Sequence, residues 1–312
     1  MNELILHHYP VSPFAEKVRA MLGFKGLAWK SVVIPLMMPK PDVVALTGGY
    51  RRTPILQIGA DVYCDTARIA RALERVAPSP TLFPYGDTFA GRAMAHFADS
   101  VLFNIAVPIG FQPGGMMQVF HPEATPEFLA AFAKDRAAMR EGGTVRRGPL
   151  AECRANMAHV LPRIELQLAD RPFLLGASAS ECDFALYHVL WPLWKVPATR
   201  PLLDGFPKTV AFVERMAGFS AAAAAEISSA QALAIAKRAK AAPIENPSAV
   251  ETGGIALGQA VQVMPVDYAL DPVKGELLQC SAEEIALRRV DRRAGSVVVH
   301  FPRFGYQMRR PG

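Results

Sequence analysis

The first 80 residues alternate strand and helix signals in an order that few folds accommodate, and this order constrains the chain more than any other feature. Residues 4–9 predict a short strand, which is ended by two closely spaced prolines. Residues 14–24 carry apolar side chains at helical spacing, and residues 29–34 are rich in β-branched side chains. A strand, a helix and a strand in this order predict a parallel pair joined by a crossover helix.

A second set of elements follows a Pro-rich loop at residues 35–41. Residues 54–58 and 62–64 flank a Gly-Ala-Asp turn, which predicts a tight antiparallel hairpin. Residues 65–76 then place apolar side chains on one face of a helix. We therefore expect residues 1–80 to form one compact mixed α/β domain.

Residues 86–242 carry mostly helical signals, interrupted by loops rich in glycine and proline. Ser180 and Asp183 fit a helix-capping box just before a long apolar run. Residues 220–242 are rich in alanine and favour a helix. We expect an all-helical domain over 86–242.

The pattern changes after the proline- and glycine-containing break at residues 243–254. Residues 260–264 and 296–301 have the composition of strands, and residues 284–290 show it less clearly. We expect a small antiparallel β-rich module over 250–312, a size close to the lower limit for independent folding.

Charge and composition limit the classes of function. The chain of 312 residues has 34 basic and 28 acidic side chains, a net charge of +6, and its basic clusters are short and scattered. This balance fits an anionic small molecule at least as well as nucleic acid, and we do not expect nucleic acid as a partner. The N-terminus lacks a signal-peptide pattern and we find no apolar run of about 20 residues, so we expect a cytoplasmic location and no membrane partner.

The cysteines predict neither disulfides nor a metal site. Cys64, Cys153, Cys182 and Cys280 form no C-x-x-C pair, and no second metal ligand follows at a zinc-like spacing. We expect isolated reduced thiols and no bound metal. Cys64, at a strand end, is expected to be a small buried apolar residue.

Four short motifs lie at the boundaries of the predicted elements. They are Ser12-Pro13-Phe14, Arg52-Thr53-Pro54, Asp65-Thr66 and Ser180-x-x-Asp183. In this order and spacing they resemble the glutathione transferase superfamily, with a serine motif like that of tau-type enzymes. The resemblance covers roughly residues 3–235 and implies a thioredoxin-like N-terminal domain, an all-α domain and, outside the resemblance, the added β-rich segment.

Ser12 is the catalytic candidate that the resemblance implies. A thiol with a pKa of about 8.5 is mostly protonated at neutral pH, and the thiolate is the nucleophile. A hydroxyl donor and a helix N-terminus each favour the anion. On local sequence alone the favoured interpretation of Ser12 is a helix cap followed by proline at the first helical position, and the downstream motifs reverse that preference. His8 and Tyr9, at the end of the first strand, are rival activators of the thiol.

The other two N-terminal motifs imply glutathione contacts. Pro54 is expected to be cis, and the backbone of Thr53 is then expected to pair with the cysteinyl part of glutathione. Asp65 suits the ammonium of the γ-glutamyl end, while the Thr66 hydroxyl and the helix amides suit its carboxylate. The family commonly has Glu or Gln followed by Ser here, so Asp65 is one methylene shorter than Glu.

Lys40 resembles the loop lysine that meets the glycyl carboxylate in omega and tau enzymes. Arg51 or Arg52 could perform the same task, and a solvated loop lysine is the alternative for Lys40.

An electrophile site is expected between the two domains, facing Ser12. Its candidate lining residues are Phe14, Phe103, Phe111, Met116, Met117 and Trp191. Helical core packing is the alternative for each of them.

These patterns lead to a functional hypothesis. The resemblance implies a glutathione transferase of the detoxification type, which uses glutathione as co-substrate to conjugate or isomerise a small hydrophobic electrophile. It also implies a homodimer. Serine at position 12, where the cysteine classes have Cys, argues against thiol transfer. The alternative is a non-catalytic, transferase-like adaptor that uses the β-rich tail for interactions.

Overall fold

The computed structural model describes residues 3–220 and 222–312; residues 1, 2 and 221 lie outside the description. The N-terminal unit contains β1 (Leu4–His8), α1 (Pro13–Phe24), β2 (Trp29–Val33), α2 (Pro41–Thr47), β3 (Ile55–Ile58), β4 (Asp61–Cys64) and α3 (Thr66–Val76). β1 and β2 are parallel, and β3 pairs antiparallel with both β1 and β4. The predicted βαβ and ββα units are therefore confirmed.

A helical region follows the proline-containing linker. It consists of α4 (Phe89–Phe97), the π-helical turn η1 (Ala98–Leu102), α5 (Phe103–Gly110), α6 (Met116–Phe120), α7 (Pro126–Ala138), α8 (Leu150–Gln167), α9 (Glu181–Lys195), the 3-10 turn η2 (Arg200–Leu203) and α10 (Pro207–Ala217). The predicted capping box is present at the start of α9. The Asp183 carboxylate accepts hydrogen bonds from the Ser180 amide at 2.9 Å and from the Ser180 hydroxyl at 2.6 Å. α9 is buried over most of its length and forms the centre of this region.

The alanine-rich segment at 220–242 is shorter as a helix than its composition suggests. Helix α11 spans Ser229–Arg238, and the residues just before it form the two-residue strand β5 (Ala225–Glu226) beside β2. α11 packs against α2, β2 and the tail strand β9, on the sheet. Pairing with the edge of β2 thus overrides the helical propensity of Ala225 in β5.

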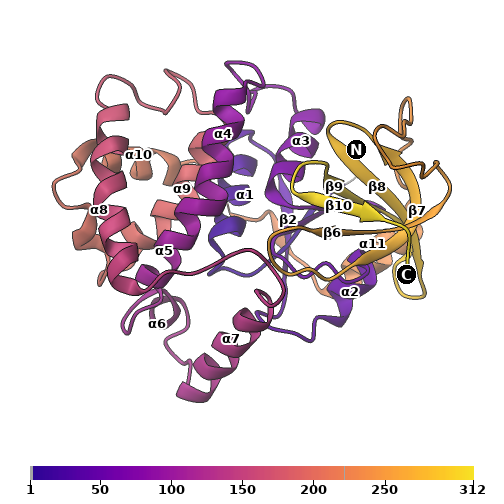
Figure 1. Cartoon of the computed structure of the whole chain (residues 1–312), viewed down its shortest axis with the longest axis horizontal. Coiled ribbons are helices and arrows are strands. Elements are labelled where there is room, and N and C mark those ends of the chain that lie inside the picture. The colour runs from indigo at the N-terminus through magenta and orange to yellow at the C-terminus, as the bar shows by residue number, and fades with distance from the viewer. Residues whose placement is uncertain (1–2, 221) are drawn as a thin grey trace.

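The tail strands extend the N-terminal sheet. They are β6 (Ala260–Pro265), β7 (Val273–Cys280), β8 (Glu284–Asp291), β9 (Gly295–Pro302) and β10 (Tyr306–Arg309). They pair antiparallel with one another as predicted, and β9 then pairs in parallel with β4. One sheet results, in the order β10-β6-β7-β8-β9-β4-β3-β1-β2-β5. Figure 1 shows the tail on the side of the sheet away from α8 and α10.

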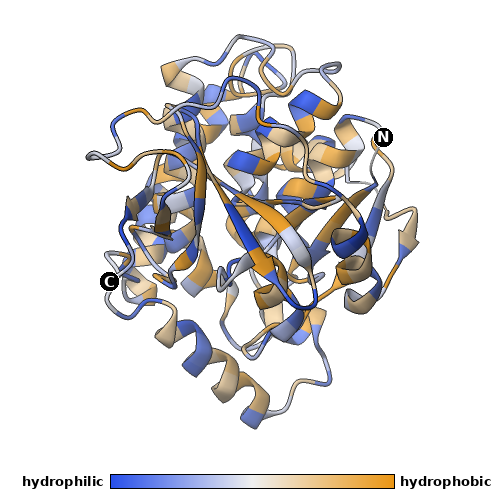
Figure 2. Cartoon of the chain, turned by 90° about the vertical axis from the view of Figure 1, so that its right-hand side faces the viewer, coloured by the Kyte–Doolittle hydropathy of each residue, from blue (hydrophilic) through white to orange (hydrophobic). Residues whose placement is uncertain are grey.

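Two apolar cores lie on the two faces of this sheet. Leu4 and Leu6 of β1 belong to the core shared with the helical region, whereas Ile5 between them belongs to the other. This alternation follows from the period of two along a strand. The second core also holds Val263 and Phe301 of the tail, so the tail and the N-terminal unit share one core. In Figure 2, viewed from the tail side, apolar residues run along the central strands.

The segment Phe89–Gly110 forms one continuous helical stretch of 22 residues across α4, η1 and α5, and its most apolar 18-residue window has a mean hydropathy of 1.3. Its length and composition would suffice to cross a membrane, although 39% of its most apolar window is buried in the structure. Core helices of soluble proteins meet the same criterion, so this stretch does not assign the chain to a membrane.

Phe301 tests whether the tail is an integral part of the fold. Its ring is fully buried in the shared core, and Phe304, three residues on, is 73% exposed. We expect Phe301→Ala to lower the free energy of unfolding by about 3–5 kcal/mol, with the N-terminal unit and the tail unfolding together. Phe304→Ala should change it by less than about 0.5 kcal/mol. Denaturant unfolding followed by tryptophan fluorescence and circular dichroism measures both, and equal stability of the two variants would contradict the shared core.

Candidate functional site

The register of three central strands brings the N-terminal motifs to one edge of the sheet. His7 of β1 lies opposite Ile55 at the start of β3, and Ile55 lies opposite Cys64 at the end of β4. The segments that continue from these strand ends carry Ser12, the Thr53–Pro54 bond and Asp65–Thr66 respectively. The N-termini of α1 and α3 begin at the same edge. Two helix N-termini beside one another favour an anionic ligand there.

Ser12 is the N-cap of α1 and is buried. Its Oγ accepts a hydrogen bond from the Ala15 amide at 3.2 Å, so the cap role expected from local sequence is present. A serine hydroxyl has one proton and two lone pairs. The cap uses a lone pair, which leaves the proton available to donate to a ligand.

The two rival activators are engaged in different ways. His8 lies between Ser31 at 2.9 Å from Nε2 and Arg19 at 3.0 Å from Nδ1, so both ring nitrogens have partners. Burial, followed by the nearby Arg19, lowers the pKa of His8 to about 3, and the ring is neutral. The Tyr9 hydroxyl accepts from Arg136 at 3.1 Å, beside Leu36.

Thr53 and Lys40 meet beside Tyr9. The Thr53–Pro54 peptide bond is cis, as predicted. Lys40 is buried; its Nζ lies 3.5 Å from the Thr53 Oγ1 and 5.3 Å from the centre of the Tyr9 ring. Burial, reinforced by the positive charges of Arg136 and Arg51 and partly offset by Asp135, lowers the pKa of Lys40 to about 7. Lys40 is therefore a buried lysine, and not the solvated loop residue of the alternative.

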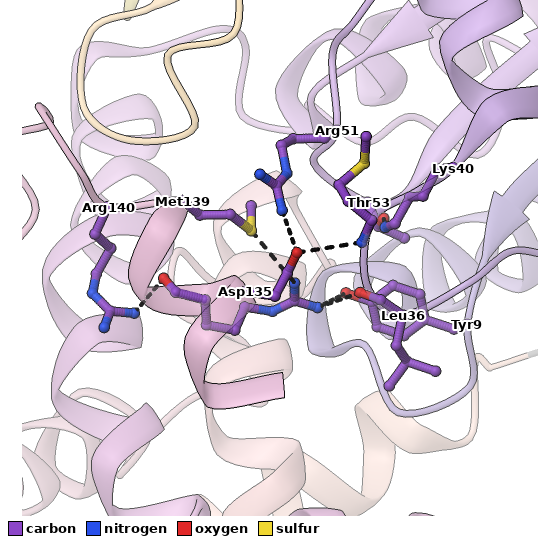
Figure 3. A network of polar contacts seen from close by, with 10 residues as sticks. Tyr9, Leu36, Lys40, Arg51, Thr53, Asp135, Met139 and Arg140 are labelled. Atoms are coloured by element: carbon purple, nitrogen blue, oxygen red, sulfur yellow. Dashed lines mark hydrogen bonds and ion pairs between the residues drawn. The ribbon is translucent and has the colours of Figure 1, made fainter. Parts of the chain in front are cut away.

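Helix α7 closes this side of the site with a cluster of charges that the sequence did not predict. Arg51 pairs with Asp135 at 2.5 Å, and Asp135 also pairs with its neighbour Arg136. Arg136 donates to the Leu36 carbonyl at 2.8 Å. Figure 3 shows that these groups converge from α7 and the loops before α2 and β3. Arg51 is thereby held by α7.

Asp65 and Thr66 begin α3. Asp65 Oδ1 accepts from the Ala67 amide at 3.0 Å, and Oδ2 accepts from the Tyr306 hydroxyl at 3.0 Å. The backbone of Asp65 has a φ of 77°, which is uncommon for a residue with a side chain. The buried Thr66 Oγ1 accepts from Lys17 at 3.2 Å, so its proton remains available to a ligand.

A buried polar network lies beneath this edge and links α1, η1 and α9. Lys17 and His188, both fully buried, flank Asp99 at 2.7 Å and 2.8 Å. Burial opposes ionisation of Asp99, but the two neighbours outweigh it and lower its pKa to about 2. The pKa of His188 is lowered, chiefly by burial and against its bond to Asp99. A sequence signal that could have pointed to this network is Lys17, a lysine placed among the apolar residues of the first helix.

The residues expected to line the electrophile site separate into four places. Phe14, two residues after Ser12 in the chain, packs on Phe103 with ring centres 4.7 Å apart. Phe111 stacks on Phe132 of α7 at 5.8 Å. Trp191 lines an open cleft of about 470 Å³ together with Phe120 and Trp194. Met116 and Met117 are buried in the core shared with the helical region. Of these candidates, Phe14 and Phe103 contact each other, and Phe14 is the one closest to Ser12 in the sequence.

The cysteines occupy apolar surroundings. Cys64 is fully buried, and burial raises the pKa of its thiol, in accord with a role in packing. Within residues 3–220 and 222–312, no three His, Cys, Asp or Glu side chains gather as a metal site would require.

Comparisons with known families agree with this geometry. The model of the glutathione S-transferase N-terminal domain matches residues 6–81, and that of the glutathione S-transferase C-terminal domain matches residues 147–215. The whole chain is 42% identical to a structure described as a GST-like protein from Pseudomonas syringae, with 100% of both chains covered and a TM-score of 0.82. The chain belongs to the glutathione S-transferase superfamily.

A more distant structure shares the fold. Glutathione S-transferase III in its apo form is 23% identical, covering 69% of this chain and 91% of its own, with a TM-score of 0.50. Rice GST1 in complex with glutathione is 19% identical over 71% of this chain and 91% of its own, with a TM-score of 0.47. A search among curated proteins gives no match.

The lowered pKa of Lys40 predicts a pH-dependent stability. In the folded protein Lys40 loses its proton near pH 7, whereas the unfolded lysine keeps it until about pH 10.4. Between these values the unfolded state binds more protons, so the Lys40 contribution to unfolding free energy should rise with pH, by at most about 1.4 kcal/mol per unit.

Urea unfolding of wild type and Lys40→Met between pH 6.5 and 9.5 measures this term. We expect wild type to gain stability relative to Lys40→Met as the pH rises. Lys208→Met removes an exposed lysine and should give no such trend. A flat or opposite difference for Lys40→Met would show that Lys40 stays charged in the folded protein.

Proposed function

We propose that this protein is a glutathione transferase in which Ser12 activates the glutathione thiol. The observation that carries the proposal is the convergence of Ser12, Thr53 and Asp65–Thr66 at one sheet edge, which is set by the register of β1, β3 and β4. Membership of the superfamily supports glutathione as the ligand. Each of the three segments then meets a different part of one tripeptide.

The proposed binding mode assigns each group by its chemistry. The backbone of Thr53, before the cis proline, pairs with the cysteinyl unit as an added strand would. The Thr66 hydroxyl and the α3 amides receive the γ-glutamyl carboxylate, and Asp65 receives its ammonium. Lys40, in its protonated form, receives the glycyl carboxylate. A bound carboxylate would itself favour that form by attraction.

The proposed chemistry begins with loss of the thiol proton to solvent. The Ser12 hydroxyl donates to the thiolate, and the N-terminus of α1 adds a favourable field. Each pKa unit by which the thiol is acidified requires about 1.4 kcal/mol, which one hydrogen bond to an anion supplies. The thiolate then attacks an electrophilic carbon. In a substitution the bond to the leaving group breaks and that group departs with its electron pair; in an addition to a double bond the carbanion that forms takes up a proton from solvent. The partners of both His8 nitrogens favour Ser12 over His8 as the activator.

We extend the proposal to the class of co-substrate and the setting of the protein. The electrophile is small and hydrophobic, and it lies against Phe14 and Phe103, with Phe111 and Trp191 further along the helical region. The protein acts as a cytoplasmic homodimer in detoxification. An adaptor without catalysis remains the competing proposal, and its motivation is weakened because the tail strands belong to the sheet that carries the site.

The decisive experiment compares two serine caps. Ser12→Ala should lower kcat/KM for conjugation of glutathione to chlorodinitrobenzene by about 10- to 100-fold and raise the apparent pKa of the bound thiol. Ser228→Ala is the matched control, because Ser228 caps α11 through the Gln231 amide at the same 3.2 Å distance. Both variants lose one cap, so only a role at the thiol separates them.

Two outcomes would contradict the proposal. Equal rates for wild type and Ser12→Ala would remove Ser12 from the chemistry. Failure of the wild-type protein to be retained on immobilised glutathione would favour the adaptor.

A further inference from the structure

The C-terminal tail, strands β6–β10, pairs with β4, the strand that directly precedes Asp65. β9 pairs in parallel with β4, with Tyr63 opposite His300. The His300 ring stacks on Tyr63 at 4.5 Å, and its Nε2 lies 2.9 Å from the buried Asp61 carboxylate. Asp65 directly follows β4, so the tail fixes the backbone position from which this side chain projects.

The other end of the tail returns to the same place. β10 is at the far edge of the sheet order, five strands from β4. Even so, Tyr306 at the start of β10 reaches Asp65, at 3.0 Å between its hydroxyl and Oδ2. The tail strands therefore curl back over the sheet edge at which the proposed glutathione site lies.

Tyr306 is a fixed donor. It is 5% exposed, its ring packs 5.5 Å from the ring of Phe301, and its hydroxyl lies 3.3 Å from that of Tyr50. Burial, followed by the charge of Asp65, raises the pKa of Tyr306 well above its ordinary value. At neutral pH the hydroxyl keeps its proton, and the Asp65 carboxylate is the acceptor that lies closest.

A second contact holds the tail at the neighbouring motif. Arg52, which precedes Thr53, pairs with the Asp267 carboxylate and donates to the Tyr268 carbonyl. The guanidinium also lies 3.8 Å from the centre of the Tyr268 ring. The tail thus touches one proposed glutathione contact, Asp65, and also Arg52, the residue beside a second one, Thr53.

We propose that Tyr306 is a positioning residue for recognition of the γ-glutamyl ammonium. The inference rests on the proposed role of Asp65 in binding glutathione. The Ala67 amide and the Tyr306 hydroxyl each take one lone pair of the carboxylate, one on either oxygen. The remaining lone pairs are then held in one orientation and are free to accept from an ammonium.

This arrangement explains how a short aspartate can serve at this position. Asp65 has one methylene fewer than Glu, and its positive φ persists only where the surroundings fix it. The cap bond supplies one restraint, and the tail supplies the other. The tail therefore makes the site selective for γ-glutamyl thiols over thiols that lack the γ-glutamyl group.

The test measures affinity for glutathione and for cysteinylglycine, which lacks the γ-glutamyl unit. Isothermal titration of Tyr306→Phe should give a Kd for glutathione about tenfold higher than that of wild type, with the Kd for cysteinylglycine unchanged. Tyr85→Phe is the matched control. Tyr85, in the linker between α3 and α4, also has a hydrogen-bonded hydroxyl, which accepts from the Ser178 amide at 2.8 Å. This control should retain the wild-type Kd for both thiols.

Each outcome decides the inference. An unchanged glutathione Kd for Tyr306→Phe overturns it, and so does an equal loss for both thiols, which marks a merely structural residue or a misfolded variant. A selective loss for glutathione supports it. If wild type binds glutathione but conjugates no electrophile, the transferase proposal fails while the two Kd values still decide the role of Tyr306. If wild type does not bind glutathione, both proposals fall.

Discussion

Backbone pairing among β1, β3 and β4 is the constraint on which the rest of the structure depends. His7 lies opposite Ile55, and Ile55 lies opposite Cys64. The three separate segments that adjoin these strand ends therefore meet at one edge of the sheet. Shifting any of these strands by one residue would turn its side chains to the opposite face. Leu4 and Leu6 would then leave one core and Ile5 the other, so the two cores fix the register that assembles the site.

Buried charge around this edge is balanced by partners from distant elements. Lys17 is fully buried in contact with Asp99, which also meets His188. Removing one partner of a buried ion pair destabilises the folded protein by more than the pair itself stabilises it, because the other charge then remains buried without a partner. Lys40 is the contrasting case, since burial, reinforced by nearby positive charges, lowers its pKa to about 7. This edge of the sheet therefore has a lysine held in an ion pair on the α1 side, Lys17, and a second lysine, Lys40, whose charge changes near neutral pH.

The tail extends the sheet of the N-terminal unit and shares an apolar core with it. Its five strands cover the edge of β4, which would otherwise present unpaired backbone groups to solvent. They also complete one apolar core and contribute Tyr306 and Asp267 to the surroundings of the site. The sequence pattern of residues 250–312 predicted strands, but it did not predict that these strands would extend the sheet of the N-terminal unit. Pairing between strands far apart in sequence leaves no local pattern, and only the assembled sheet reveals it.

The sequence by itself determined the elements and the family. Helical spacing, the Ser12 and Ser180 caps, the hairpin turn and the proline at 54 are local signals, and each acts within a few residues. The roles of Ser12, Lys40, Asp65 and Thr66 toward glutathione stay predictions. Only the tertiary structure decided that Asp65 meets a tyrosine 241 positions away and that Lys17 meets an acid 82 positions away. Such contacts depend on how whole elements pack, because neither partner carries a nearby sequence signal of the other.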